Sequence, residues 1–264
     1  MSFSESEVQL IRGVAPLAAL FLGLVVERVA PHAALRPAWR ANLGLWLLGA
    51  IGMAAICGAC GWTVAGWAQA SGIGLLNEVD VPLGAGIAAT VVGLDLVSYA
   101  WHRVNHEVGF LWRFHRVHHT DADYHVSTAL RFHPGELALA LPVRLGVIAL
   151  LGAPPVAVVA FEAIFGIANV LEHGNFDLPP RIERILGAAL VTPALHRRHH
   201  STERSERDSN FGTILSLWDR LAQTLTPSTS AEVFPTGLPG SAGAGARSLA
   251  AMLLAPIRSN ADRR

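Results

Sequence analysis

Long apolar segments constrain the fold of this chain more than any other feature of its sequence. A helix that crosses a bilayer needs about 20 mainly apolar residues. Three segments approach or exceed this length, and two shorter ones are separated by an Ala-Pro-Pro turn sequence. The segments are residues 8–26, 43–68, 81–100, 137–151 and 156–171. The pattern predicts an all-α integral membrane bundle with four or five membrane helices, two of which are joined by a tight turn.

Composition also indicates a membrane protein. Hydrophobic residues make up 52% of the 264 residues and charged residues only 15%, against about 25% in soluble domains. The formal net charge is zero, which argues against nucleic acid as a partner because no basic excess is available to neutralise phosphates. The acidic start MSFSESEVQL lacks the basic region of a signal peptide, so none is expected.

Eight histidines form three clusters in the middle of the chain. Residues i, i+3 and i+4 share one face of a helix, so each cluster directs its imidazoles to one side. Neutral imidazole is the commonest metal ligand in proteins, and eight of them exceed what one ion binds. The pattern therefore predicts a two-metal site. The clusters are His102 and His106, then His115, His118 and His119, and finally His196, His199 and His200.

The arginines predict which side of the membrane these histidines face. The loop after the first apolar segment carries Arg28, Arg36 and Arg40, whereas residues 71–80 carry only acidic charges. The segments around the histidine clusters are also rich in arginine. Loops rich in Lys and Arg stay on the cytoplasmic side. We therefore expect the histidine-bearing helices to form a cytoplasmic cap on an inner or plasma membrane.

One acidic residue lies within a predicted membrane helix near the first cluster. Asp95 precedes His102 by seven residues and shares its helical face. An ionisable group inside a membrane helix is costly and marks a functional site by default. We expect Asp95 to accept a hydrogen bond from a ligand imidazole and so to fix its tautomer. Pairing with an arginine is the alternative.

Around these clusters the sequence resembles the fatty acid hydroxylase and sterol desaturase superfamily of membrane di-iron enzymes. The resemblance rests on DLVSYAWHRVNH, LWRFHRVHHTDADY, STALRFHPGE, HRRHHS and SNFGTILSLWDRLAQTLTP. It covers residues 81–227, which are expected to form the catalytic domain. Residues 1–80 would form N-terminal membrane helices, and residues 228–264 a tail rich in Pro, Gly and Ala with a short apolar helix at 249–257.

The resemblance implies further site residues. Relatives carry another histidine-bearing helix between the second and third clusters, which makes His173 a ninth ligand. Asn169 lies one turn earlier, where its amide would hold a water at the metals or serve only in packing. Glu162 precedes Asn169 by seven residues and is expected to face the site, unless it pairs with an arginine. His133 is either a ligand or a cap of the next helix, and His125 stands where relatives have asparagine and is left out of the ligand set.

The resemblance also implies a reaction. Two iron ions, replaceable by zinc in purified protein, would use O₂ and electrons to hydroxylate or desaturate a C–H bond of a lipid, of sterol or fatty acyl type, that enters from the bilayer. The sequence has no flavin or nicotinamide fingerprint, so the electrons would come from a separate redox protein. The lipid and the choice between the two reactions stay open. A non-catalytic membrane metal-binding or transport protein and a zinc-dependent lipid hydrolase remain alternatives.

The predicted orientation can be tested by cysteine labelling in a variant that lacks Cys57 and Cys60. A single cysteine in the Arg113 or Arg197 region should react in intact cells with a membrane-permeant maleimide and not with an impermeant one, because arginine-rich segments stay on the cytoplasmic side. A cysteine within residues 71–80 is the control and should react with both reagents. Labelling of the Arg113 region from outside would reverse the orientation.

Overall fold

The computed structural model describes residues 5–57, 60–229, 232–240 and 247–258 as a helical membrane protein. Four helical segments of this described chain are long and apolar enough to cross a bilayer. They are Trp39–Glu78, Leu83–Glu107, Pro134–Leu151 and Pro155–Glu172. The prediction of an all-α membrane bundle is confirmed, with four spans by length and composition.

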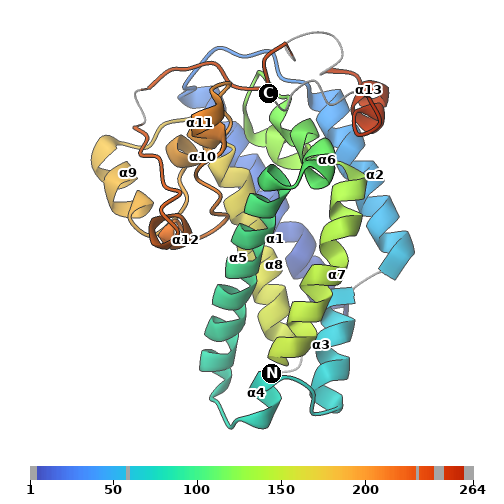
Figure 1. Cartoon of the computed structure of the whole chain (residues 1–264). Coiled ribbons are helices and arrows are strands. Elements are labelled where there is room, and N and C mark those ends of the chain that lie inside the picture. Colours follow the sequence, from blue (N-terminus) through green and yellow to red (C-terminus); the bar gives the residue numbers. More distant parts are fainter. Residues whose placement is uncertain (1–4, 58–59, 230–231, 241–246, 259–264) are drawn as a thin grey trace.

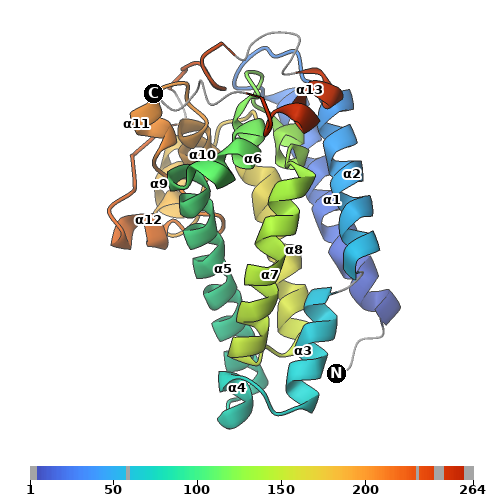
Figure 2. The ribbon, with the colours of Figure 1, turned by 45° about the vertical axis from the view of Figure 1, so that its right-hand side comes forward.

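Helix α8 (Pro155–Glu172) lies in the middle of the bundle (Figures 1 and 2). Helices α1 (Glu5–Val29) and α5 (Leu83–Glu107) pack along it, and α3 (Cys60–Ala70) contacts both α8 and α7 (Pro134–Leu151). Small residues allow these close approaches. A Cβ atom on Gly166 of α8, for example, would come within 2.6 Å of Pro16 on α1.

The apolar segment expected at residues 43–68 is covered by two helices, α2 (Trp39–Cys57) and α3, while residues 58–59 lie outside the described part. Helix α2 packs against α7. After α3, the short α4 (Leu75–Glu78) leads into α5 at the end of the bundle away from the cap (Figure 1). The bundle is therefore built from α1, α2, α3, α5, α7 and α8, and α1, expected to span at residues 8–26, is not among the four candidate spans of the described chain.

The predicted tight turn between α7 and α8 is present and depends on a glycine. Gly152 has φ of 63°, a left-handed conformation that glycine adopts without steric cost. Its amide donates to the carbonyl of Ala149. A Cβ atom at this position would also lie 2.6 Å from Nδ2 of Asn77. Pro155 then opens α8, where its missing N–H costs nothing.

Short helices form a cap over one end of the bundle (Figures 1 and 2). The chain turns sharply after α5 into α6, and later returns to the cap after α8. Helix α13 packs against α2 and is the short apolar helix of the tail. The cap elements are α6 (Gly109–His119), η1 (Val126–Leu130), α9 (Pro180–Gly187), α10 (Pro193–His199), α11 (Arg204–Arg207), α12 (Leu217–Leu221) and α13 (Leu249–Leu254).

A buried arginine joins this cap to the membrane helices. Arg131 is fully buried and lies 3.2 Å from the carboxylate of Asp121. Its guanidinium also donates to Oδ1 of Asn42 on α2 at 3.0 Å and to the carbonyl of Val117 on α6 at 3.1 Å. Since a buried charge is tolerated only when it is paired and hydrogen-bonded, these contacts fix the position of α6 relative to α2.

We expect Arg131→Met to destabilise the protein by about 3 kcal/mol, or roughly 6–12 °C, because it leaves Asp121 buried without its counter-ion. Thermal unfolding in detergent measures the effect. Arg103→Met is the control, because Arg103 is exposed and pairs with Glu107 only at the surface. Adding Asp121→Asn to Arg131→Met should restore part of the loss. An Arg131→Met protein as stable as wild type would contradict this account of the junction.

Candidate metal centre

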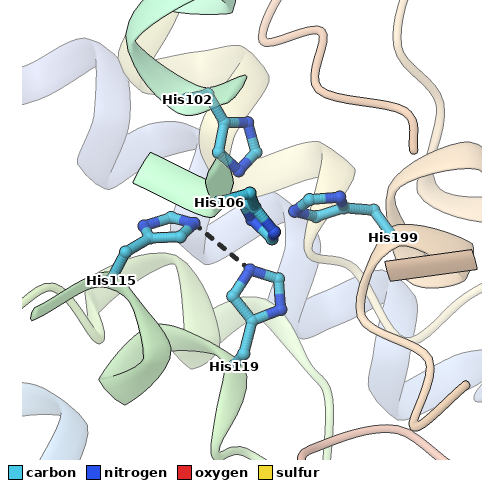
Figure 3. Close-up of side chains that lie close together, drawn as sticks. All are labelled: His102, His106, His115, His119 and His199. Atoms are coloured by element: carbon cyan, nitrogen blue, oxygen red, sulfur yellow. Dashed lines mark hydrogen bonds between the residues drawn. The ribbon is translucent and has the colours of Figure 1, made fainter. Parts of the chain in front are cut away.

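The first group of histidines joins α5, α6 and α10 (Figure 3). Helix α5 ends at Glu107, and the extended Val108 turns the chain directly into α6, so that the histidine-bearing faces of both helices meet. The nitrogen atoms Nε2 of His115 and His119 lie 3.2 Å apart. One donor atom from each of the five side chains lies within 4.8 Å of all the others. The members are His102, His106, His115, His119 and His199.

The second group lies beside the first and takes the remaining histidines of both triplets. The Nε2 atom of His173, just after α8, is 3.1 Å from Nε2 of His118 and 3.1 Å from Nε2 of His196. His200 completes the group. Each HxxHH triplet is thus divided between the two groups. On α6, His115 and His119 belong to the first group. In the third cluster, the residues at the same two positions, His196 and His200, belong to the second group.

The structure therefore brings together all nine histidines predicted as ligands and divides them into sets of five and four. His133 and His125 belong to neither set. His133 caps α7 instead, since its Nδ1 accepts a hydrogen bond from the amide of Gly135 at 2.9 Å. His125 contacts Ser127 and Thr128 at the start of η1.

Burial lowers the pKa of six of these histidines, all of them outside the membrane spans. Loss of hydration is the largest cause in each case, and the neighbouring imidazoles add to it in most of them. It lowers the pKa of His173 to about 4 and that of His199 to about 3. A neutral imidazole has a free lone pair for a metal ion. The pKa is lowered well below its ordinary value for His118, His119, His196 and His200.

Hydrogen bonds at the second ring nitrogen orient several of these side chains. The Nδ1 atom of His102 lies 2.9 Å from the carbonyl oxygen of Phe211, and that of His199 lies 2.6 Å from the carbonyl oxygen of Ser209. His115 Nδ1 contacts the carboxylate of Glu136 at 2.8 Å. Because these acceptors hold the proton on Nδ1, the lone pair is left on Nε2.

The donor set fits two metal ions. The Nε2 atoms of His102, His106 and His199 are buried and have no hydrogen-bond partner among the described residues. Two nitrogen ligands that share an ion at about 2.1 Å lie about 3.0–3.4 Å apart, and the Nε2–Nε2 separations of 3.1–3.2 Å agree with that range. Neutral nitrogens facing each other this closely, without enough protons to share, are best satisfied by a cation between them.

Comparison with known proteins identifies the family. The family model described as fatty acid hydroxylase matches residues 87–224, which is more than half of the chain and includes all nine histidines. The chain belongs to this family. No solved structure matches it.

Curated relatives of this fatty acid hydroxylase family member modify lipids. An ornithine lipid hydroxylase of Rhizobium tropici is 34% identical over 51% of this chain and 40% of its own length. An alkylglycerol monooxygenase of Danio rerio is 32% identical over 54% of this chain and 31% of its own length. A cholesterol 25-hydroxylase of Rattus norvegicus is 25% identical over 50% of this chain and 43% of its own length. The chain thus spans less than half the length of each of these relatives.

The structure corrects the role predicted for Asp95. No hydrogen bond joins its carboxylate to an imidazole in the described chain, and it accepts hydrogen bonds from the loop before α12 and from Trp218 of α12 instead. The donors are the amides of Ile214 at 3.0 Å and Leu215 at 3.2 Å, Thr213 Oγ1 at 2.8 Å and Trp218 Nε1 at 2.8 Å. The seven-residue spacing placed Asp95 on the correct face of α5, but the loop covers that face between the carboxylate and the imidazoles.

The other two predicted catalytic residues differ in their positions. Asn169 lines the cavity beside the histidines, and its amide donates to the carbonyl of Ala129 at 3.0 Å. Glu162 does not line that cavity. Its carboxylate lies 3.2 Å from where a Cβ atom on Gly61 of α3 would stand, so it faces the neighbouring helix. Eleven residues span about 16 Å along a helix, which places Glu162 well below His173, and we assign it no role in the chemistry.

Two buried carboxylates at the site were not predicted. Glu136 bonds to His115, and Glu172 lies within 3.9 Å of His173 and His196. The rule that singled out Asp95, namely that an acid in an apolar helix is costly, applies equally to Glu172. For Glu136, the only indication of a functional role in the sequence was its place in the STALRFHPGE motif.

Asp95→Asn should lower the unfolding temperature of the metal-free protein. Four donors converge on the carboxylate, and an amide would offer one acceptor oxygen and place an NH₂ group against donors, which costs at least about 2 kcal/mol. Asp80→Asn, at an exposed position, should have no effect. Unchanged stability of Asp95→Asn together with a loss of activity per bound metal would instead restore a direct role in the chemistry.

Proposed function

We propose that this protein is a membrane-bound oxidoreductase that hydroxylates a C–H bond of a lipid, using O₂ and electrons from a separate redox protein. Two iron ions held by the nine histidines would be its cofactors. The observation that carries the proposal is a cavity that reaches both histidine groups from among the membrane helices. Lipid-modifying relatives support the same conclusion.

The cavity has a volume of about 90 Å³ and lies between α5, α7 and α8. Apolar side chains such as Val97, Val143 and Phe165 line its membrane part. A long apolar chain entering from the bilayer would therefore meet the imidazoles of both groups at the end of this cavity. Those at the lining are His102, His115, His118, His173 and His196.

The protein's own side chains would hold the metal ions and orient the lipid. Amino-acid side chains offer no oxidant for an unactivated C–H bond, and two bound iron ions would supply the reduction of O₂ and the oxidation of that bond. The neutral imidazoles hold the ions, and the ring of Phe132 stacks on His118 with a centroid distance of 4.5 Å. Trp101 lines the cavity, and its buried indole N–H has no partner in the described chain, so it is a candidate donor to a polar atom of the lipid.

The relatives favour hydroxylation over desaturation. Those compared here are named hydroxylases or a monooxygenase, and the lipids in their names are ornithine lipid, alkylglycerol and cholesterol. These lipids share an apolar body and a polar group. We therefore propose a membrane lipid with a polar group as the substrate class, without choosing between a sterol and an acyl or alkyl lipid.

The site geometry argues against the other two candidate functions. A membrane transporter binds its ion near the middle of the bilayer, whereas these histidines lie where the helices end and the cap begins (Figure 1). A hydrolytic zinc site usually keeps three protein ligands and an open position, fewer than either group offers. We place the site on the cytoplasmic side, in line with the arginine-rich cap, where a redox protein would supply electrons.

Metal analysis tests the two-ion part of the proposal. Protein purified anaerobically and loaded with Fe²⁺ should hold two metal ions per chain, counting any zinc in place of iron. His106→Ala and His200→Ala, one from each group, should each lose one ion. His32→Ala is the control, since His32 contacts Asp177 away from both groups. A wild-type protein that saturates at one ion of any element would refute the two-metal site.

Membranes of a host that lacks this protein, incubated with the loaded enzyme, a reductant and ¹⁸O₂, test the reaction. A lipid that gains one labelled oxygen atom is the expected product, and the His→Ala variants should not form it. A product that has lost two hydrogens would indicate desaturation. Turnover that proceeds equally without O₂ would indicate a hydrolase and would refute the proposal.

A further inference from the structure

Glu172 is a buried carboxylate beside the second histidine group, and no hydrogen bond to an imidazole accounts for its position there. It is the last residue of α8 and is 3% exposed. Its Oε1 atom lies 3.9 Å from Nε2 of His196 and 3.9 Å from Nδ1 of His173. Its Oε2 atom is buried and has no hydrogen-bond partner in the part of the chain that the structure describes. The side chain also lines the cavity that ends at the histidines.

No protein group nearby balances the charge of this carboxylate. Within the described chain, its ion-pair contacts are the two histidines alone. Both histidines are themselves predicted ligands in the second group, so neither is a fixed counter-ion such as an arginine would be. An uncompensated buried carboxylate costs several kcal/mol. A cation that belongs between these side chains would remove that cost.

The distances allow Glu172 to share an ion with the histidines. Two ligands bound to one ion at about 2.1 Å can lie at most about 4.2 Å apart. The 3.9 Å between Glu172 Oε1 and His196 Nε2 falls within this limit. His196 Nε2 is also the atom that faces Nε2 of His173 at 3.1 Å, so the carboxylate approaches the side of the group where the imidazole lone pairs meet.

We propose that Glu172 is a ligand of the metal ion in the second group, which it would complete to four imidazoles and one carboxylate. The inference rests on the proposed function, because it assumes that both groups hold metal. The first group already has five imidazoles, whereas the second has four. Glu172 would bring the second group to five protein ligands and would give it the only negative charge among them.

The two other buried glutamates near the site differ from Glu172 in a way that supports this assignment. Glu136 contacts Nδ1 of His115 at 2.8 Å, the nitrogen that faces away from the other donors, so it orients a ligand. Glu183 accepts a hydrogen bond from Thr192 and lies outside both groups. Glu172 alone of these three is directed at the metal-facing nitrogen of a histidine without any hydrogen bond to its carboxylate.

Titration of metal-free protein with Co²⁺ tests the proposal. Binding is followed by the metal content of the protein, by the d–d absorbance of bound Co²⁺ and by the rise in unfolding temperature. Wild type should bind two ions. Glu172→Gln should bind the first ion as wild type does and the second at least about ten-fold more weakly. The metal-free Glu172→Gln protein should be no less stable than metal-free wild type, because the substitution removes an unbalanced charge, yet metal should raise its unfolding temperature less.

Glu183→Gln is the matched control, a buried glutamate away from the histidines, and should bind both ions as wild type does. His196→Ala should lose the second ion. If Glu172→Gln does not fold, Glu172→Asp gives the answer, since the shorter carboxylate should also weaken only the second ion. Equal affinities in wild type and the Glu172 variant would overturn the inference alone. A wild-type protein with fewer than two sites would overturn the proposed function.

Discussion

The hydrogen bonds that hold the outward-facing nitrogens of the histidines are the interactions on which the rest of the site depends. An imidazole offers its Nε2 lone pair only when the proton sits on Nδ1. Main-chain carbonyls accept that proton from His102, His173 and His199. A carbonyl cannot ionise and cannot be replaced by substitution, so the backbone of the cap sets the tautomers of His102 and His199, and that of α8 sets the tautomer of His173.

This dependence explains why an acid lies inside a membrane helix. The loop that supplies the carbonyls of Ser209 and Phe211 is held by two carboxylates. Asp219 accepts hydrogen bonds from the amides of Phe211 at 2.8 Å and Gly212 at 2.7 Å, and Asp95 accepts those of the two residues that follow Thr213. Helix α5 thus contributes two histidines of the first group and also anchors the loop that orients one of them.

The parts of this structure that depend on local periodicity could be predicted from the sequence. The apolar segments, the turn at Gly152 and the nine clustered histidines all follow from spacing along single helices or from motif resemblance. The partners of Asp95 could not, because they lie 118 to 123 residues later, in a loop and on the short α12, and no periodicity of the sequence describes the path of that segment. Glu162 shows the same limit. Its spacing from Asn169 gives its position on α8, but the spacing does not reveal that α3 packs against that position.

The place of the two histidine groups at the junction of bundle and cap follows from two opposing solvent requirements. The hydrocarbon core of a bilayer tolerates only backbone whose hydrogen bonds are satisfied within the protein, so loops with carbonyls free to bind imidazoles belong beyond it. An apolar lipid, in contrast, is most soluble within that core. The cavity between α5, α7 and α8 connects the two regions. Only at the ends of these helices can one set of side chains contact both an apolar chain and an irregular backbone rich in acceptors.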